Sequence, residues 1–126
     1  MIQNDLKIEL LETWEATYKK GQLTLWVFLA LKEGEKYVSD IKDFVEANSQ
    51  NTITCEEQSL YRTLRKFKKL GMVNYQEKEG FKGPNRKYYI LTDLGLELLH
   101  AFTERNIKLF FNDNLKNLLF NKQLAL

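Results

Sequence analysis

The chain has 126 residues, of which 44% are apolar and 13% aromatic, enough to bury one hydrophobic core. It contains no run of about 18 apolar residues, and its N-terminus carries acids where a secretory signal would carry basic and then apolar residues. These features predict neither a membrane span nor secretion. The single cysteine, Cys55, has no partner for an internal disulfide, which fits a reducing compartment. We therefore expect a cytoplasmic protein.

The net charge of +2 conceals an uneven distribution along the chain. Residues 54–90 hold nine basic and four acidic side chains, a balance of +5, so the remaining residues sum to −3. Phosphate binding depends on the charge of the surface that meets the nucleic acid, and less on the total. The segment 54–90 is therefore the part of the chain that predicts a nucleic-acid surface.

The first predicted helix lies at the N-terminus. Asn4 or Asp5 is expected to cap it, and Gly21 to end it. Its apolar residues recur at every fourth position from Leu6 to Tyr18. Such a stripe indicates a helix that covers a core or a partner.

Two further helices are predicted before the basic segment. Residues 22–33 are apolar nearly all round, so this helix should be central and buried, and Gly34 closes it. Ser39 is expected to be the N-cap of a short helix that ends in the polar, turn-forming run 48–51. This pair resembles the positioning half of a helix-turn-helix.

The next helix has one apolar and one cationic face. Thr54 and Glu57 are expected to form a capping box at its start, and Gly71 to stop it. The apolar face consists of Leu60, Leu64 and Phe67, and the opposite face of Gln58, Arg62, Arg65, Lys66 and Lys69. A plain solvated surface helix is the alternative interpretation. Against it, acids are confined to the first turn, and the stretch 62–69 holds five basic residues without an acid.

A β-hairpin is predicted after this helix. Residues 72–75 and 87–91 favour strands, and the Gly- and Pro-rich run 80–85 favours a turn at their tip. Basic residues near such a tip also protect a sheet edge from aggregation, which is the alternative explanation of their presence. A helix followed by a basic hairpin is the layout of a winged helix-turn-helix, in which the helix enters the DNA major groove.

The same residues carry a resemblance to a known family. The dipeptide Leu60-Tyr61, the spaced Leu64, Phe67 and Gly71, and the block from Gly83 to Gly95 resemble the PadR family of bacterial transcription regulators. Within that block, Arg86-Lys87-Tyr88-Tyr89 and Leu91-Thr92-x-x-Gly95 are the most specific part. The resemblance covers about residues 22–99.

The resemblance implies a mainly α protein with a small β-hairpin: a winged helix-turn-helix followed by a C-terminal dimerisation helix. It implies a homodimeric regulator, usually a repressor, that binds an inverted-repeat operator in double-stranded DNA and is often released by a small apolar or aromatic effector. By correspondence with the family, Tyr61 lies on the recognition helix and Arg86-Lys87 begins the second strand. The expected division is an additional helix at 1–20, the winged helix-turn-helix at 21–92, and the dimerisation helix and tail at 93–126.

The predicted DNA contacts combine this resemblance with the helical wheel. Gln58 and Arg62 are favoured for base reading because they make bidentate contacts to adenine and guanine, and Lys66 and Lys69 for phosphate. On the recognition helix the predicted residues are Gln58, Ser59, Tyr61, Arg62, Arg65, Lys66 and Lys69. On the wing they are Lys82, Gly83, Asn85, Arg86 and Lys87.

The chain departs from the family pattern in three places. Tyr37-Val38-Ser39 stands where the family commonly has His-Gly-Tyr, which puts a usual backbone contact of that tyrosine in question. Arg62 stands where the family commonly has proline, which suggests an altered operator preference. The resemblance does not account for the N-terminal helix, which we interpret as an addition that stabilises the dimer or covers the core.

The C-terminal segment carries more apolar surface than an isolated exposed helix tolerates. The predicted dimer interface consists of Leu94, Leu98, Leu99, Phe102, Leu109 and Phe110. The alternative is that this helix folds back on its own domain. The run 112–114 interrupts the helical pattern, and a short terminal helix is expected after it.

Trp26 with Phe102 is the candidate for an effector cavity, with core packing as the alternative role of both tryptophans, Trp14 and Trp26. Cys55 is either a thiol activated by the helix dipole and Arg62 or an inert one. His100 has no second ligand at a spacing typical of zinc. We expect no cofactor, no metal and no enzymatic site. A winged-helix module for protein interaction, with an incidental basic face, is the alternative function.

Overall fold

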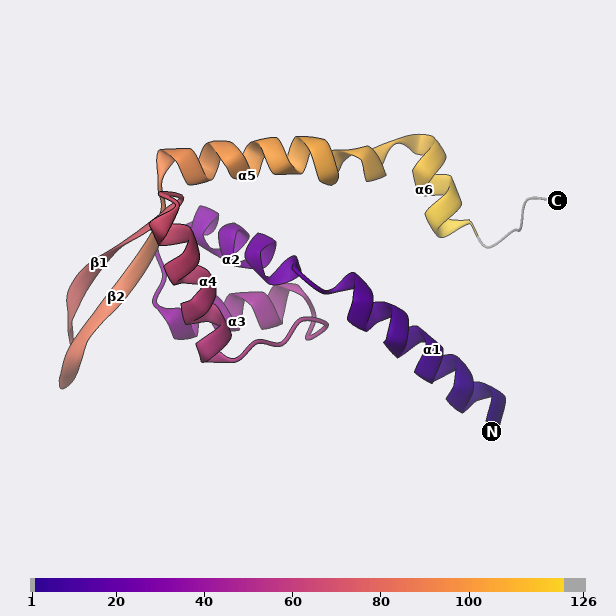
Figure 1. Cartoon of the computed structure of the whole chain (residues 1–126), viewed down its shortest axis with the longest axis horizontal. Coiled ribbons are helices and arrows are strands. Elements are labelled where there is room, and N and C mark those ends of the chain that lie inside the picture. The colour runs from indigo at the N-terminus through magenta and orange to yellow at the C-terminus, as the bar shows by residue number, and fades with distance from the viewer. Residues whose placement is uncertain (1, 122–126) are drawn as a thin grey trace.

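The computed structural model describes residues 2–121, and in this part of the chain six α-helices, one 3-10 helix and a two-stranded antiparallel hairpin are formed. Figure 1 shows a helical body with the hairpin on one side. Two arms, α1 and the segment from α5 to α6, extend from the opposite side. In chain order the elements are α1 (Ile2–Tyr18), α2 (Gln22–Glu33), α3 (Val38–Asn48), α4 (Glu57–Lys69), β1 (Val73–Gly80), β2 (Gly83–Leu91), α5 (Asp93–Asn106), η1 (Lys108–Phe111) and α6 (Asp113–Phe120).

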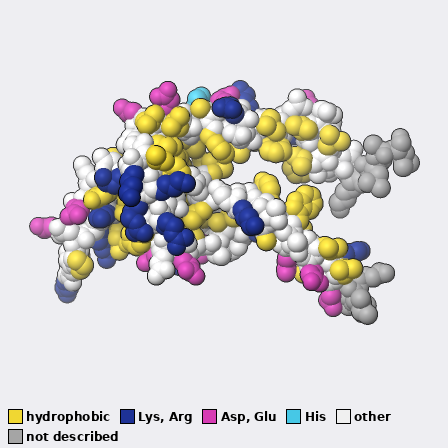
Figure 2. Space-filling view, viewed as in Figure 1, with side chains coloured by type: hydrophobic (Ala, Val, Ile, Leu, Met, Phe, Trp, Pro, Cys, Tyr) yellow, Lys and Arg dark blue, Asp and Glu magenta, His cyan; other side chains and the backbone are white. Residues whose placement is uncertain are grey.

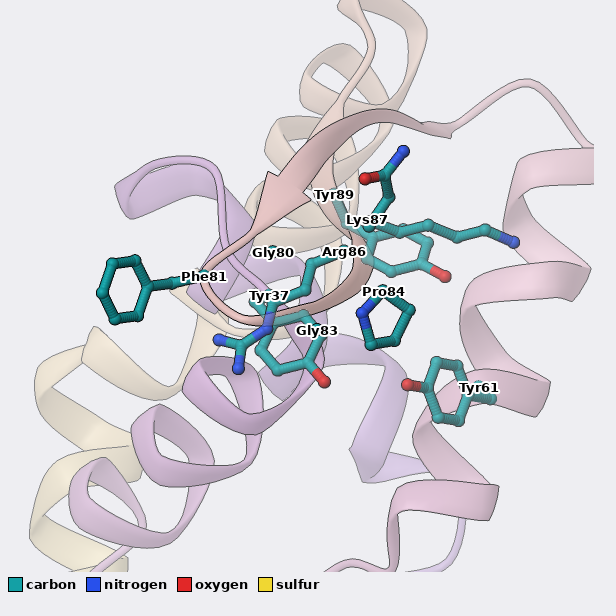
Figure 3. A pocket seen from close by; sticks show the side chains of 10 residues that line it. Tyr37, Tyr61, Gly80, Phe81, Gly83, Pro84, Arg86, Lys87 and Tyr89 are labelled. Carbon is teal, nitrogen blue, oxygen red and sulfur yellow. The ribbon is translucent and has the colours of Figure 1, made fainter.

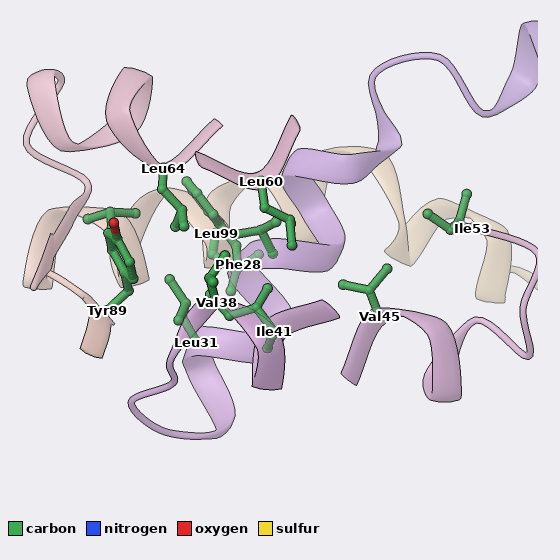
Figure 4. Close-up of a cluster of buried hydrophobic side chains, with 13 residues drawn as sticks. Phe28, Leu31, Val38, Ile41, Val45, Ile53, Leu60, Leu64, Tyr89 and Leu99 are labelled. Atoms are coloured by element: carbon green, nitrogen blue, oxygen red, sulfur yellow. The ribbon is translucent and has the colours of Figure 1, made fainter. Parts of the chain in front are cut away.

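The core lies between α2, α3, α4, the base of the hairpin and one position of α5 (Figure 4). Leu60 and Leu64, one turn apart on α4, are fully buried, which confirms the apolar face predicted for that helix. The ring of the half-buried Phe67 meets Phe28 of α2 edge-on, with centroids 5.2 Å apart. The central position predicted for residues 22–33 is also confirmed, because four residues of α2 are buried.

The hairpin is longer than the sequence indicated. The two strands stay paired from Val73 opposite Leu91 to Gly80 opposite Gly83, and a turn of only Phe81 and Lys82 joins them. The predicted six-residue tip is therefore wrong. Proline is tolerated in an outer strand because its missing N–H can face solvent, so Pro84 does not end the pairing.

The base of the hairpin is tied to the loop between α2 and α3. The N–H of Lys36 donates to the carbonyl oxygen of Tyr89 over 3.1 Å, and the N–H of Tyr89 donates back to Lys36 over 2.8 Å. The Tyr89 side chain is buried in the core. These bonds fix the direction in which the hairpin leaves the helical body.

Three predicted helix starts are wrong. α1 begins at Ile2, before Asn4 and Asp5. α3 has Tyr37, not Ser39, as its N-cap residue. α4 begins at Glu57 after the N-cap residue Glu56, and no side chain caps it, so the Thr54 capping box does not form.

The loop between α3 and α4 explains the last of these differences. The Ser49 hydroxyl is buried and accepts a hydrogen bond from the Ile53 N–H over 3.1 Å. This bond keeps Ile53 in the core and leaves Thr54 exposed and outside the helix.

The Leu-Thr-x-x-Gly motif joins the hairpin to α5. Thr92 caps α5: its hydroxyl accepts from the Gly95 N–H over 3.1 Å and donates to the Gly71 carbonyl over 2.6 Å. A Cβ on Gly95 would collide with the carbonyl oxygen of Met72. Glycine is needed here because the helix lies directly against the turn before β1.

The interruption predicted at 112–114 is confirmed at Asn112 only, because α6 already begins at Asp113 and α5 ends earlier, at Asn106. The Asn112 side chain accepts hydrogen bonds from the N–H groups of Asn114 and Leu115, and so starts α6. The end of the predicted tail, beyond residue 121, lies outside the described residues.

Candidate nucleic-acid interface

The exposed face of α4 is a cluster of cations. Its buried side anchors the helix on Leu60 and Leu64, so the basic side chains are turned outward. In the part of the chain that the structure describes, none of them forms a salt bridge. Figure 2 shows Lys and Arg side chains gathered over α4 on the face toward the viewer. The exposed cations of the helix are Arg62, Arg65, Lys66, Lys68 and Lys69.

The acids of α4 are confined to its start. Glu56 and Glu57 stand at the positive end of the helix dipole, and the last turn holds Lys66, Lys68 and Lys69. A cationic surface without acids among its members attracts polyanions at a range set by the ionic strength. This arrangement is the one expected of a surface that binds a phosphate backbone.

A groove of about 500 Å³ separates α4 from the hairpin (Figure 3). Its walls come from three elements: the residue before α3, one residue of α4, and both strands with their turn. It is lined by Tyr37, Tyr61, Gly80, Phe81, Gly83, Pro84, Asn85, Arg86, Lys87 and Tyr89. The structure thus brings Tyr61 of the predicted recognition helix together with four of the five predicted wing residues.

Arg86 is held in this groove by an aromatic ring. Its guanidinium carbon lies 4.7 Å from the centroid of the Tyr37 ring, within the range of a cation–π contact. Figure 3 shows the Arg86 side chain beside Tyr37, with Tyr61 facing them from α4. We did not predict a role for Tyr37 in the groove, because the contact depends on the pairing of Lys36 with Tyr89, far along the chain.

A second ring supports two further cations. The Nζ atoms of Lys87 and Lys68 lie 4.6 and 5.2 Å from the centroid of Tyr75, so β2 and α4 place their cations on the same side chain. Lys78 differs, because it forms an ion pair with Glu35. Lys68, absent from our predicted contacts, therefore belongs to this surface as well.

Two tyrosines of the groove keep their protons at neutral pH. Burial raises the pKa of Tyr61, with Tyr37 and Glu57 adding to the effect. Burial also raises the pKa of Tyr89. The Tyr61 hydroxyl lines the groove as a neutral group that can donate a hydrogen bond to an anion.

The remaining predicted contacts fall at three places. Gln58 is exposed on the same side of α4 as Arg62 and Lys69. Ser59 is half-buried and lines a different hollow, on the Cys55 side of the helix. Lys82 forms the turn of the hairpin, with a φ of 59°, and is exposed outside the groove lining.

Comparison with known proteins decides the family. A profile of the PadR-like family of transcriptional regulators matches residues 27–101, more than half of the chain. The chain belongs to this family. PadR-family members are transcription regulators and not enzymes. A search of curated proteins found no match.

Solved PadR structures share the fold. A PadR-like transcriptional regulator from Bacillus cereus has 25% identity and a TM-score of 0.66, over 84% of this chain and 99% of its own. A PadR family regulator from Eggerthella lenta has 21% identity and a TM-score of 0.68, over 96% and 99%. Bacillus subtilis PadR, solved in complex with operator DNA, has 22% identity and a TM-score of 0.58, over 64% and 46%.

The C-terminal segment of this PadR-family chain is largely exposed. Five of the six predicted dimer residues (Leu94, Leu98, Phe102, Leu109, Phe110) remain accessible. Leu99 is the exception: it is 4% exposed and belongs to the core of its own chain. The prediction for Leu99 is corrected because the α5 helix turns this position toward the winged body.

The predicted effector residues line one cavity. Trp26 and Phe102 lie together in a space of about 730 Å³ where α2 faces α5. The lining is mainly apolar, with Phe28, Leu98 and Phe110 among its other members. Core packing, the alternative role of Trp26, also applies, because Trp26 packs against the buried core.

Of the two roles considered for Cys55, the structure favours the inert thiol. Burial raises the pKa of its thiol, Glu46 raises it further, and Lys42 opposes them. Among residues 2–121 no cluster of three or more His, Cys, Asp or Glu side chains is placed to hold a metal ion. No helix of this range has the length and apolar character needed to cross a bilayer.

Proposed function

We propose that this PadR-family protein is a sequence-specific DNA-binding repressor that acts as a homodimer on an inverted-repeat operator. The observation that carries the proposal is the unpaired cationic face of α4 beside the groove of the hairpin. A regulator of this kind acts where the DNA is, so we place it in the cytoplasm.

In the proposed complex α4 lies in the major groove. Gln58 and Arg62 face the base edges, where an amide and a guanidinium make bidentate contacts to adenine and guanine. Lys66 and Lys69, further along the exposed face, contact phosphate. The arrangement is supported by the burial of Leu60 and Leu64, which fixes the rotation of the helix.

The wing binds the backbone next to the major groove. Arg86, positioned by the Tyr37 ring, and Lys87, positioned by Tyr75, present charge at the rim of the groove that Tyr61 lines. A phosphate between the hairpin and α4 would meet both cations and the Tyr61 hydroxyl. These contacts carry no sequence information and set the register of α4 on the duplex.

The exposed apolar side chains of α5 support a homodimer. Leu94, Leu98 and Phe102 recur at every fourth position on one side of the helix and remain accessible in the single chain. A two-fold dimer places two copies of α4 about one DNA turn apart, which an inverted repeat matches. Bacillus subtilis PadR was solved with operator DNA, and this supports DNA binding by the present chain.

Release by a small apolar or aromatic effector fits the cavity of Trp26 and Phe102. A ligand there would lie between α2, which belongs to the winged body, and α5, which belongs to the proposed interface. It would change how the two α4 helices are spaced. Quenching of Trp26 emission in a Trp14→Phe background tests binding, with Phe102→Ala as the variant expected to weaken it.

Selection of bound DNA from a random pool tests the whole proposal. We expect recovery of an inverted repeat whose half-site centres are about 10 base pairs apart. Recovery of sequences without symmetry would contradict the dimer. Failure to enrich any sequence would favour the alternative, a winged-helix module that binds protein.

A further inference from the structure

Exposed apolar side chains are concentrated on the two arms. Among the described residues, eighteen large apolar side chains are exposed: six lie on α1, ten on the segment α5–η1–α6, and only Leu70 and Phe81 lie elsewhere. A monomer rarely leaves large apolar side chains exposed in groups of this size. Figure 2 shows these side chains along both arms, including the sides that face the gap between them.

The α1 arm has a defined apolar stripe. Leu6, Leu10, Trp14 and Tyr18 follow one another at every fourth position, over about 18 Å of helix. Trp14 is 73% exposed and Leu10 60% exposed, so the winged body does not cover them. The stripe ends at the turn before Gly21, whose φ of 80° separates α1 from α2.

The acids of α1 lie away from this stripe. On a helical wheel Asp5, Glu9, Glu12 and Glu15 occupy the side opposite Leu10. With Lys7 as its one basic residue, α1 has a net charge of −3. The stretch 107–121 has two lysines and one acid, a net charge of +1. The α5 helix itself has a net charge of −2, so the charge opposite to that of α1 is confined to residues 107–121, the end of the C-terminal arm.

We propose that the α1 stripe of one copy packs on the α5–η1–α6 arm of a second copy, and that two-fold symmetry repeats this contact. The inference rests on the homodimer of the proposed function and adds a second contact to it. A stable dimer buries about 1,600 Å² in total. The half-exposed residues of α5 are few for that area, and the α1 stripe supplies more.

The α1 helix thereby acts as a clasp. Leu10 and Trp14 cover apolar side chains such as Leu118 and Phe120 of the partner, while the α1 acids remain on the outside near Lys116 of the partner subunit. Each copy gives its α1 helix to the other and receives the other's α1 helix, so no such surface is left for a third copy and the assembly stops at a dimer.

The dimer dissociation constant of the full chain tests the clasp. Leu10→Glu places a charge within the stripe, and Ala16→Glu places the same charge on the opposite side of α1, so the second variant is the matched control. Analytical ultracentrifugation should show at least a tenfold weaker dimer for Leu10→Glu. The control should stay within about threefold of the unmodified chain. Equal effects of the two variants would overturn the proposal.

Cross-linking between copies tests which arm α1 covers. In a Cys55→Ser background, one chain carries Leu11→Cys and a second, differently tagged chain carries Leu118→Cys, and a short bismaleimide joins them. We expect the mixed product, and its absence would overturn the proposal. A cross-link within one chain that carries both substitutions, without the mixed product, would show that α1 covers its own C-terminal arm and would also overturn it.

The variant Leu98→Glu separates the two proposals. If Leu98→Glu breaks the dimer and Leu10→Glu does not, only the clasp fails. If the unmodified chain is a monomer at micromolar concentration, the homodimer of the proposed function fails, and the clasp fails with it.

Discussion

The winged body and the two arms of this protein use apolar residues in opposite ways. In the body, Leu60, Leu64 and Ile41 are fully buried, and the face of α4 that remains exposed is cationic. In the arms, side chains of the same type remain exposed along α1 and α5. The body buries its apolar side chains within one copy, whereas we propose that a partner covers the apolar surface that the arms expose.

Because of this difference, the sequence pattern indicates a different kind of binding partner for the body than for the arms. In the body a single chain buries the apolar side chains that the pattern predicts to be buried. The exposed side chains of α4 are cationic, and they indicate an anionic ligand. In the arms one chain leaves the apolar side chains exposed, and the proposed partner of this surface is another apolar surface. The proposed operator binding requires both, because the arms set the spacing of two α4 helices.

A leucine-to-alanine substitution should change the free energy of unfolding much more in the body than in the arms, and this is the largest effect that we expect. Leu60→Ala removes a fully buried side chain and should lower the free energy of unfolding by about 2–5 kcal/mol. Leu10→Ala, at a position that is 60% exposed in the single chain, should cost less than about 1 kcal/mol at a protein concentration low enough for the chain to be monomeric. Guanidinium unfolding followed by circular dichroism measures both, and equal losses would contradict the division into body and arms.

Gly95→Ala tests the junction between the body and the C-terminal arm. Its Cβ would meet the Met72 carbonyl, so we expect a loss of about 1–3 kcal/mol in the free energy of unfolding. Gly83→Ala is the control, because a Cβ there meets nothing within 4 Å. A thermal unfolding midpoint unchanged by Gly95→Ala would show that α5 is not seated on this turn.

Changes on α4 should affect DNA binding without affecting folding. Arg62→Ala should weaken specific binding by about 1–3 kcal/mol and relax the preference at one base pair. Lys66→Ala should weaken binding to all sequences alike and lower the salt slope by about 1. Lys32→Ala, an exposed lysine in the last turn of α2 that lies outside α4 and the hairpin, is the control for lost charge. Unchanged affinity in both α4 variants, measured by fluorescence anisotropy, would remove α4 from the interface.

Oxidation of Cys55 should have the smallest effect on operator binding. Because burial raises the pKa of Cys55, the thiolate fraction at neutral pH is lower than in a free cysteine, and it grows only as the pH rises. Iodoacetamide should therefore react slowly at pH 7, and mild peroxide should leave operator affinity unchanged. Loss of binding that Cys55→Ser prevents would contradict this.

The local sequence pattern was sufficient to predict which side of α4 is buried and where the helical pattern breaks before α6. The spacing of Leu60 and Leu64 predicted the buried side of α4, and Asn112 predicted the break before α6. Helix starts were less predictable. Thr54 and Ser39 suit caps by residue type, but the bond between Ser49 and Ile53 and the position of Tyr37 decide where the helices begin.

Long-range contacts account for what the sequence did not predict. Tyr37 reaches the groove because Lys36 pairs with Tyr89, a contact across more than fifty residues. Leu99 and Leu98 are neighbours of the same type, and only the packing of α5 decides that Leu99 enters the core and Leu98 does not. Periodicity locates an apolar stripe but does not identify which part of it the chain itself covers.

The salt dependence of operator binding is the most direct test of the central claim, that the cations of α4 and the hairpin bind the DNA backbone. The logarithm of the association constant should fall linearly with the logarithm of the salt concentration, by about 0.9 per phosphate contacted. With several phosphates bound by each copy, the slope should be steeper than about −4, and Arg86→Ala should reduce it. A slope near zero would contradict the account.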